Sequence, residues 1–246
     1  MGTGVHSKAL HRAAEIVGGR VELCTKLGVS LRELEAWMSG REPPMSVFLK
    51  AVDIITFAPH PGARQRAEAT RAAALSREQI GKAAKPLSVL GFLQAKFDPM
   101  DGSWMVEAAL DAALRATGAE RGNLQLLCAD GLRIVAQRGF EQPFLDFFAR
   151  VHDGEGCCGA ALKARGRVLV SDVATDPLFA GTPEGEVLTA ARVRAVQSTP
   201  LIGAGGDLVG MLSTHYERVW HPGEQELDVL DHIARRTAFW LSGGEL

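Results

Sequence analysis

The chain has 246 residues, 27 Lys and Arg against 29 Asp and Glu, a formal net charge of −2 and 46% hydrophobic residues. Because the charge is nearly balanced, the whole molecule has no net attraction to nucleic acid. The sequence has no run of about 18 apolar residues that would span a membrane, and no signal-peptide pattern. Its four cysteines are too few and too irregularly spaced for a disulfide framework or a zinc module. These features predict one or two domains in a reducing, cytoplasmic setting without a membrane partner.

The first 57 residues have the apolar spacing of a compact bundle of short helices. Gly18 and Gly19 end the first helix, and residues 28–30 separate the second helix from the third. Ser30 is placed to cap that third helix, and Pro43 precedes the fourth. Residues 1–57 are therefore expected to form an all-α domain.

Residues 20–37 resemble the helix-turn-helix pattern of phage-repressor-like DNA-binding domains. Small Cys24 lets the two helices approach each other, and Gly28 supplies the left-handed residue of the turn. By this resemblance the second helix of the pair enters the major groove, with Arg32 on guanine. The residues expected at DNA are Ser30, Leu31, Arg32, Glu35 and Ala36 in the groove, with Lys26 and Arg41 at phosphates.

Two acidic residues on the same helix favour a different interpretation. Glu33 and Glu35 would face a polyanion, so phosphate contacts would add little affinity. The alternative is a signalling adaptor that does not bind DNA, whose bundle contacts a kinase or a response regulator. Both interpretations stay open on the sequence alone.

Residues 58–103 are expected to be a helical linker. The stretch 63–84 is rich in Ala, Arg and Glu and has few large apolar residues, which is typical of a mostly solvated helix. Residues 87–97 are too apolar for a free linker. We expect them to pack on the C-terminal domain or on a partner.

Strands and helices are mixed in residues 104–246. The expected elements are a helix over 105–117, strands over 122–128, 132–138 and 167–173, two strands within 194–216, and a helix after Pro222. Each face of the last two strands mixes apolar and small polar residues. That composition predicts a sheet covered on both sides, with a polar cavity on one of them.

Five segments of this region, 122–127, 132–140, 154–162, 168–173 and 193–216, resemble the GAF domain, a small-molecule sensor module of bacterial signalling proteins. The resemblance covers roughly residues 104–242 and is nearest to GAF domains of two-component sensor proteins. It implies an α+β fold, a GAF-type antiparallel sheet flanked by helices. GAF domains bind cyclic nucleotides, bilins, haem, metals or small acids, so the ligand and any cofactor stay unknown.

The same resemblance implies a pocket on the sheet. The expected ligand-binding residues are Gln197, Thr199, Ser213, His215 and Phe179, with Cys157 and Cys158 beside them. A cavity filled by the protein's own side chains is the alternative.

Cys157 and Cys158 begin a predicted helix, and a helix N-terminus lowers the pKa of a thiol and favours the reactive thiolate. They are therefore redox candidates, although small residues that simply pack are the alternative. The spacing of His152, Cys157 and His215 does not require a metal ion, and no metal site is predicted.

The broad apolar stripe of the C-terminal helix predicts a homodimer, because one sheet would not cover it. The leading hypothesis is a one-component transcriptional regulator that senses a small molecule or redox state through its GAF domain and binds DNA. The second is the adaptor, and the third is a GAF-type sulfoxide reductase. The cysteines do not match that reductase pattern, so no catalytic residue is assigned and the chain is predicted not to be an enzyme.

Overall fold

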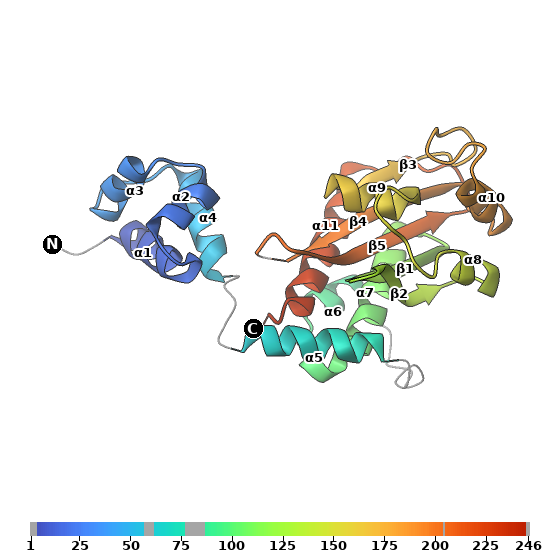
Figure 1. Cartoon of the computed structure of the whole chain (residues 1–246), viewed down its shortest axis with the longest axis horizontal. Coiled ribbons are helices and arrows are strands. Elements are labelled where there is room, and N and C mark those ends of the chain that lie inside the picture. The colour runs from blue at the N-terminus through green and yellow to red at the C-terminus, as the bar shows by residue number, and fades with distance from the viewer. Residues whose placement is uncertain (1–3, 57–61, 77–86, 204, 245–246) are drawn as a thin grey trace. The chain divides into compact units, whose positions relative to one another are not determined.

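The computed structural model describes residues 4–56, 62–76, 87–203 and 205–244 (Figure 1). It divides the chain into two compact units, Met1–His60 and Pro61–Leu246. The expected domain boundary at residues 57–58 and the expected end of the linker helix at residue 84 lie outside the described residues. In the described part of the chain, no helix combines the length and the apolar character needed to cross a bilayer.

The first unit is helical. Its elements are α1 (Val5–Val17), α2 (Arg20–Leu27), α3 (Leu31–Met38) and α4 (Met45–Thr56). Leu10, Leu23 and Leu34 are fully buried and join α1, α2 and α3 in one hydrophobic core. Gly28 ends α2 with φ 71°, in the left-handed region that the sequence predicted for this turn.

The second unit is built on a five-stranded antiparallel sheet in the order β2-β1-β5-β4-β3 (Figure 1). The strands are β1 (Arg121–Cys128), β2 (Gly131–Arg138), β3 (Val168–Val170), β4 (Ala195–Ile202) and β5 (Leu208–Tyr216). Helices flank this sheet, so the predicted α+β fold class is confirmed.

Each face of the sheet has its own set of helices, as Figure 1 shows. One set consists of α5 (Ala63–Leu75), α6 (Val89–Gln94), the short 3-10 helix η2 (Pro99–Asp101), α7 (Gly102–Thr117) and α11 (Glu224–Leu241). The other consists of α8 (Gln142–Phe147), α9 (Gly156–Ala164) and α10 (Pro183–Ala190). We call these two sides the helix face and the pocket face. Successive strand residues point to opposite sides, so each strand contributes to both.

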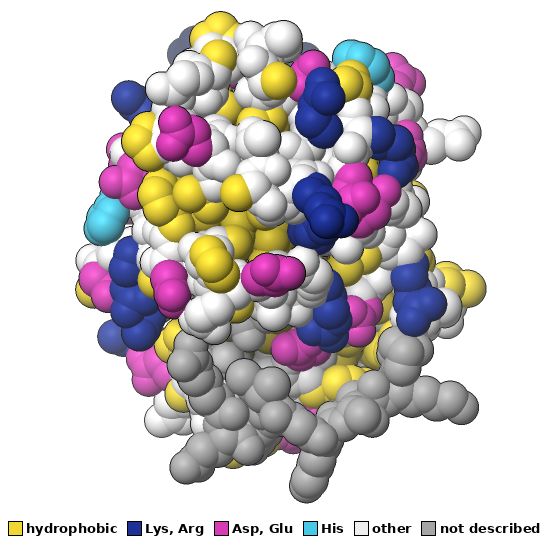
Figure 2. Space-filling model, turned by 90° about the vertical axis from the view of Figure 1, so that its right-hand side faces the viewer, with side chains coloured by type: hydrophobic (Ala, Val, Ile, Leu, Met, Phe, Trp, Pro, Cys, Tyr) yellow, Lys and Arg dark blue, Asp and Glu magenta, His cyan; other side chains and the backbone are white. Residues whose placement is uncertain are grey.

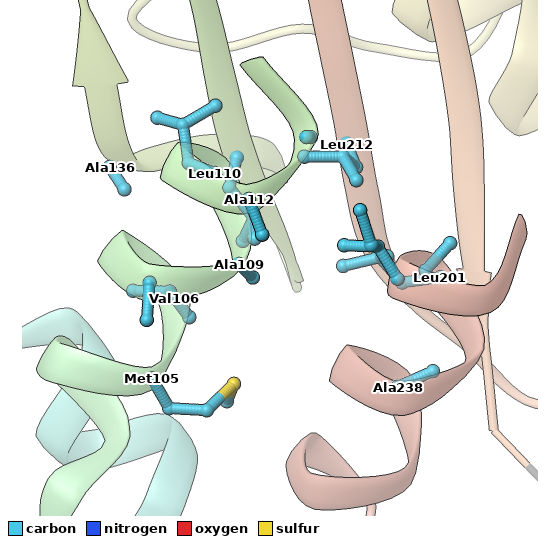
Figure 3. Close-up of a cluster of buried hydrophobic side chains, with 14 of the residues drawn as sticks. Met105, Val106, Ala109, Leu110, Ala112, Ala136, Leu201, Leu212 and Ala238 are labelled. Atoms are coloured by element: carbon cyan, nitrogen blue, oxygen red, sulfur yellow. The ribbon is translucent and has the colours of Figure 1, made fainter. Parts of the chain in front are cut away.

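The largest hydrophobic core lies on the helix face. Figure 3 shows Leu110 of α7 level with Leu212 of the sheet and Met105 of α7 level with Ala238 of α11, with Leu201 between these two levels. All five are fully buried. Such dense apolar packing is the main source of stability in a domain of this size.

Helix α5 packs closely on the rest of the second unit, although its sequence predicted a mostly solvated helix. Ala73 and Ala74 are buried, and α5 contacts α7, η2 and α11. A Cβ atom on Gly102 would lie 2.1 Å from the carbonyl oxygen of Thr70, so glycine permits this approach. Arg71 Nε donates to the carbonyl oxygen of Leu241 at 3.0 Å. Helix α5 therefore docks through its backbone, which requires few large apolar side chains.

An aromatic cluster packs the segment after α5 against α11. The Phe97 ring lies 4.9 Å from Trp104 and 5.7 Å from Trp240, measured between ring centroids. Fully buried Phe92 of α6 adjoins them. The expectation that residues 87–97 pack on the C-terminal domain is met. Residues 87–97 cover apolar surface of the C-terminal helix that the sequence analysis left for a second subunit. The apolar stripe of that helix is therefore no longer a reason to expect a dimer. The homodimer stays a prediction.

Candidate functional site

A small cavity lies on the pocket face, between the sheet and the layer of α8, α9 and α10. Its walls are Asn123, Gln125, Phe144, Phe148, Val151, Glu155, Gly156, Cys157, Cys158, Phe179, Leu188, Val196 and His215. The cavity volume is about 20 Å³, which holds one water-sized group. The cavity is small because phenylalanine rings fill most of the space above the strands.

Strand β1 places two amide side chains in this cavity. Asn123 and Gln125 alternate with Leu124 and Leu126, which enter the core of the helix face. The alternation follows from the two-residue period of a strand. Since β1 lies between β2 and β5, both amides are almost fully buried, with exposed fractions of 2% and 1%.

Three polar atoms at the cavity have no hydrogen-bond partner among the described residues. They are Asn123 Oδ1, Gln125 Oε1 and His215 Nδ1. His215 comes from β5 and is 3% exposed. A buried polar atom without a partner costs about 1–3 kcal/mol, so three around one cavity are expensive for a purely structural role. A water molecule or another polar group of that size in the cavity would satisfy these atoms.

The His215 ring is neutral at physiological pH. Burial lowers its pKa to about 3, and the positive charge of nearby Arg121 contributes. The edges of two phenylalanines enclose the ring, with centroid distances of 4.9 Å to Phe140 and 6.0 Å to Phe144. A neutral imidazole offers one acceptor and one donor nitrogen.

Of the two neighbouring cysteines, Cys157 is buried and Cys158 is partly buried. Cys157 Sγ lies 3.5 Å from the carbonyl oxygen of Val168, and Cys158 Sγ lies 3.4 Å from Ser198 Oγ and 3.2 Å from Ser213 Oγ. Burial raises the pKa of both thiols. The predicted lowering by the helix N-terminus is therefore wrong, because desolvation of a thiolate outweighs it. A redox role for the pair stays a prediction.

Two of the expected pocket residues lie on the other face of the sheet. In the antiparallel register Gln197 pairs with Thr214, and Gln197 Nε2 donates to Thr214 Oγ1 at 3.1 Å. Thr199 Oγ1 donates to Gln197 Oε1 at 2.8 Å and accepts from Arg167 Nε at 3.1 Å. Arg167 also donates to the carbonyl oxygen of Leu227 in α11. Gln197 and Thr199 therefore face the helices, and their assignment to the pocket is wrong.

The other expected pocket residues lie on the correct side. Phe179 and His215 line the cavity, whereas Ser213 is bonded to Cys158 and Ser198 beside it. The sequence analysis missed Asn123 and Gln125. Their alternation with leucines on a central strand was the available signal.

A larger groove lies outside the cavity, beside α8 and α10. Its volume is about 450 Å³, and its lining is Arg121, Gly139, Glu141, Pro143, Phe144, Val187, Ala190, Ala191 and Arg192. Figure 2 looks onto the side of the molecule where α8 and α10 lie in Figure 1, and shows a hydrophobic area bordered by basic and acidic side chains. Phe144 lines both the groove and the cavity, so its ring separates them.

In the first unit, the acidic residues of α3 are engaged within the bundle. The Glu33 carboxylate accepts from Ser30 N at 2.9 Å and Ser30 Oγ at 2.6 Å, which completes a capping box and holds the pKa of Glu33 below its usual value. Glu35 forms an ion pair with Arg20 at 3.6 Å. The Glu33 carboxylate keeps its negative charge in this cap, whereas Arg20 offsets part of the charge of Glu35.

The residues expected at DNA lie on or next to α2 and α3. Lys26, Ser30, Leu31, Arg32, Glu35 and Arg41 are exposed, and Ala36 is half-buried. The hydroxyl of Ser30 is used by the helix cap. In the described part of the chain, no group of three or more His, Cys, Asp and Glu residues is placed to hold a metal ion.

Comparison with known proteins identifies the second unit. The family profile described as "GAF domain" matches residues 105–239. No curated protein sequence matches the chain. A domain of a two-component sensor histidine kinase from Sinorhizobium meliloti is similar at 23% identity, over 55% of this chain and 87% of that one, with a TM-score of 0.47. The free methionine-R-sulfoxide reductase of Neisseria meningitidis is similar at 17% identity, over 76% and 94%, with a TM-score of 0.47.

A second free methionine-R-sulfoxide reductase, from Thermoplasma acidophilum, is similar at 17% identity, over 55% of this chain and 88% of that one, with a TM-score of 0.45. At such identities the likeness shows the fold alone. It still overturns one prediction. The chain was predicted not to be an enzyme, and this is wrong as an inference from the fold, because enzymes are among the proteins that share it.

Proposed function

The chain belongs to the GAF domain family, and we propose that it is a cytoplasmic one-component regulator. In this proposal the second unit senses a small molecule, and the first unit binds DNA as a helix-turn-helix. A ligand that prefers one arrangement of the protein changes DNA binding by its difference in affinity for the two arrangements.

One observation carries the sensor part of the proposal. Asn123 Oδ1, Gln125 Oε1 and His215 Nδ1 are buried without partners around a single cavity. A ligand that donates hydrogen bonds to them recovers the free energy that the empty arrangement loses. A cavity kept only for packing would be filled by apolar side chains.

The DNA-binding part is supported by the short turn at Gly28 and by the exposed residues of α3. Arg32 is exposed near the start of that helix, where side chains of a recognition helix reach base edges. The ion pair with Arg20 offsets part of the charge of Glu35, one of the two acids on which the adaptor alternative depended. We propose that two copies of the chain read two half-sites about one helical turn of DNA apart.

Selection of bound fragments from genomic DNA, followed by gel shift on the enriched site, tests this function. Arg32→Ala is expected to weaken specific binding about 10-fold to 100-fold, the value of one bidentate contact with a base. The matched control is Arg64→Ala on α5, which removes the same charge from a side chain that is 94% exposed. It is expected to leave DNA affinity unchanged.

Two results would contradict the regulator proposal. One is the absence of any enriched site at low salt as well as at high salt. The other is an equal loss of affinity in Arg32→Ala and Arg64→Ala, which would mean binding by charge alone. A protein partner that is captured reproducibly after nuclease treatment, together with either result, would replace the regulator with the adaptor.

A further inference from the structure

The chemistry of the cavity wall indicates what kind of ligand it takes. Two of the unpartnered atoms, Asn123 Oδ1 and Gln125 Oε1, are carbonyl oxygens and can only accept. The third, His215 Nδ1, accepts in the tautomer that carries its proton on Nε2. Three acceptors around a space of about 20 Å³ match a group of the size of water that has three N–H donors.

The charged residue that lines the cavity has the same preference. No Lys or Arg is among the described residues that line it, and its one acidic residue is Glu155. Glu155 Oε2 accepts from His152 N at 2.8 Å, which fixes the carboxylate at the rim. Arg121 is near His215, but it lines the outer groove and forms an ion pair with Glu217 at 2.8 Å. An anion would therefore meet the three acceptors and the Glu155 carboxylate, whereas an ammonium would meet one adverse charge, that of Arg121 near His215.

The aromatic walls also suit a cation. Phe144, Phe148 and Phe179 surround the same space, and a cation near a ring face is attracted by the ring quadrupole. The groove beyond Phe144 has a balanced set of charges, with Arg121, Glu141 and Arg192 in its lining. It therefore does not exclude a cation from the entrance.

We propose that the cavity holds the ammonium group of a small primary organic amine, with Asn123, Gln125 and His215 accepting its three N–H bonds. This inference depends on the proposed function, since it names the ligand class of the same site. The organic part of the amine lies toward the groove and displaces the Phe144 ring, which now separates the two spaces. Phe144 is 5% exposed and stacks on Phe140 at 3.7 Å, so entry requires this ring to turn.

Three probes of the same length separate the ligand classes: n-butylammonium, 1-butanol and butyrate. Binding to the full chain is measured by calorimetry and by saturation-transfer NMR at constant ionic strength. We expect butylammonium to bind, butanol to bind at least about tenfold more weakly because it has one donor, and butyrate not to bind.

Substitutions locate the binding in the cavity. Gln125→Met is expected to weaken butylammonium binding at least about tenfold, the value of one hydrogen bond to a charged group. Gln197→Met, the same change on the opposite face of the sheet, is the matched control and is expected to leave this affinity unchanged. Phe144→Ala is expected to increase the association rate by opening the passage.

The outcomes separate this inference from the proposed function. If butyrate binds better than butylammonium and Gln125→Met weakens it, the cavity is a ligand site and the amine assignment is wrong. If butylammonium binds equally to wild type and Gln125→Met, the ammonium lies elsewhere and the inference fails. If no probe binds to wild type or Phe144→Ala, the amine assignment also fails, while DNA selection still decides the regulator proposal.

Discussion

Gln125 and Gln197 are the same residue type, buried to 1% and 0% exposure on opposite faces of one sheet. On the helix face, Gln197 donates to Thr214 and accepts from Thr199. On the pocket face, Gln125 Oε1 has no partner among the described residues. The two side chains are equally buried, but only Gln125 faces a cavity with room for one water-sized group. The helix face therefore completes its hydrogen bonds within the protein, whereas the pocket face leaves hydrogen-bonding capacity unused among the described residues.

The largest effect is expected in the core of the helix face. Leu212→Ala removes a fully buried side chain of β5 and should lower the free energy of unfolding by about 3 kcal/mol, because a cavity remains. Denaturant titration measures this loss. Leu169→Ala on β3, at a side chain that is 36% exposed, is the control and should cost below about 1 kcal/mol. Equal losses would mean that the helix face is no better packed than the surface.

The next effect depends on pH and belongs to the pocket face. The pKa of His215 is about 3 in the folded protein against an ordinary 6.5, so as pH falls the unfolded chain takes up the proton first. The stabilisation is complete above pH 6.5 and is lost on acidification toward pH 3. Between pH 6.5 and 5 the loss should be about 2 kcal/mol.

Urea titrations at several pH values measure this loss. The variant His215→Gln should lack this part of the pH dependence, while the other titrating groups contribute equally to both proteins. Parallel pH profiles for wild type and variant would show that the His215 ring is protonated in the folded state.

A smaller effect on stability is expected for Gln197 and Gln125, the two buried glutamines compared above. Gln197→Met removes the hydrogen bonds with Thr214 and Thr199, which keep Tyr216 and Arg167 as partners, and should cost about 1 kcal/mol. Gln125→Met removes an unpartnered oxygen at nearly constant volume and should be neutral or slightly stabilising. Thermal or denaturant unfolding compares the two directly. A greater loss for Gln125→Met would show that its amide has a structural partner.

The smallest effect concerns the alkylation rates of Cys157 and Cys158, which should both be low. Burial raises the pKa of Cys157 and Cys158, so the thiolate needed for alkylation is scarce. With iodoacetamide at neutral pH, mass spectrometry should find buried Cys157 at least about tenfold slower to react than Cys128. Cys158 is partly exposed, as Cys128 is, so its raised pKa alone should slow its reaction. Rapid modification of Cys158 in the folded protein would favour the redox interpretation over simple packing.

The sequence predicted the local structure well because the signals for it are local. Ser30 caps α3, Gly28 adopts the left-handed turn, and the glycine-rich stretch after Ile202 separates β4 from β5. The side of the sheet on which each residue lies was harder to predict. Alternation places Gln197 and Ser198 on opposite sides, but residues of both kinds are mixed on each side, so the pattern does not say which side holds the cavity.

Other parts of the site depend on contacts between distant segments. Phe144 divides the cavity from the groove only because α8 folds over β1 and β5, and nothing in residues 142–147 alone indicates this. Helix α5 was misjudged for a related reason. Its alanines resemble a solvated helix until Gly102, far along the chain, is seen to admit its backbone.

The docking of α5 matters for the choice of boundaries when a shorter fragment of the chain is expressed. A fragment limited to residues 105–239, where the family profile matches, would lack α5, Phe92, Phe97 and Trp240. The surface of α7 that α5 and these aromatic residues cover would then be a solvent-exposed hydrophobic patch, and two fragments would tend to associate through it. Fragments of the second unit should therefore begin before Ala63 and extend through Gly243. Dimerisation of a shorter fragment would be a result of the truncation and not a property of the full chain.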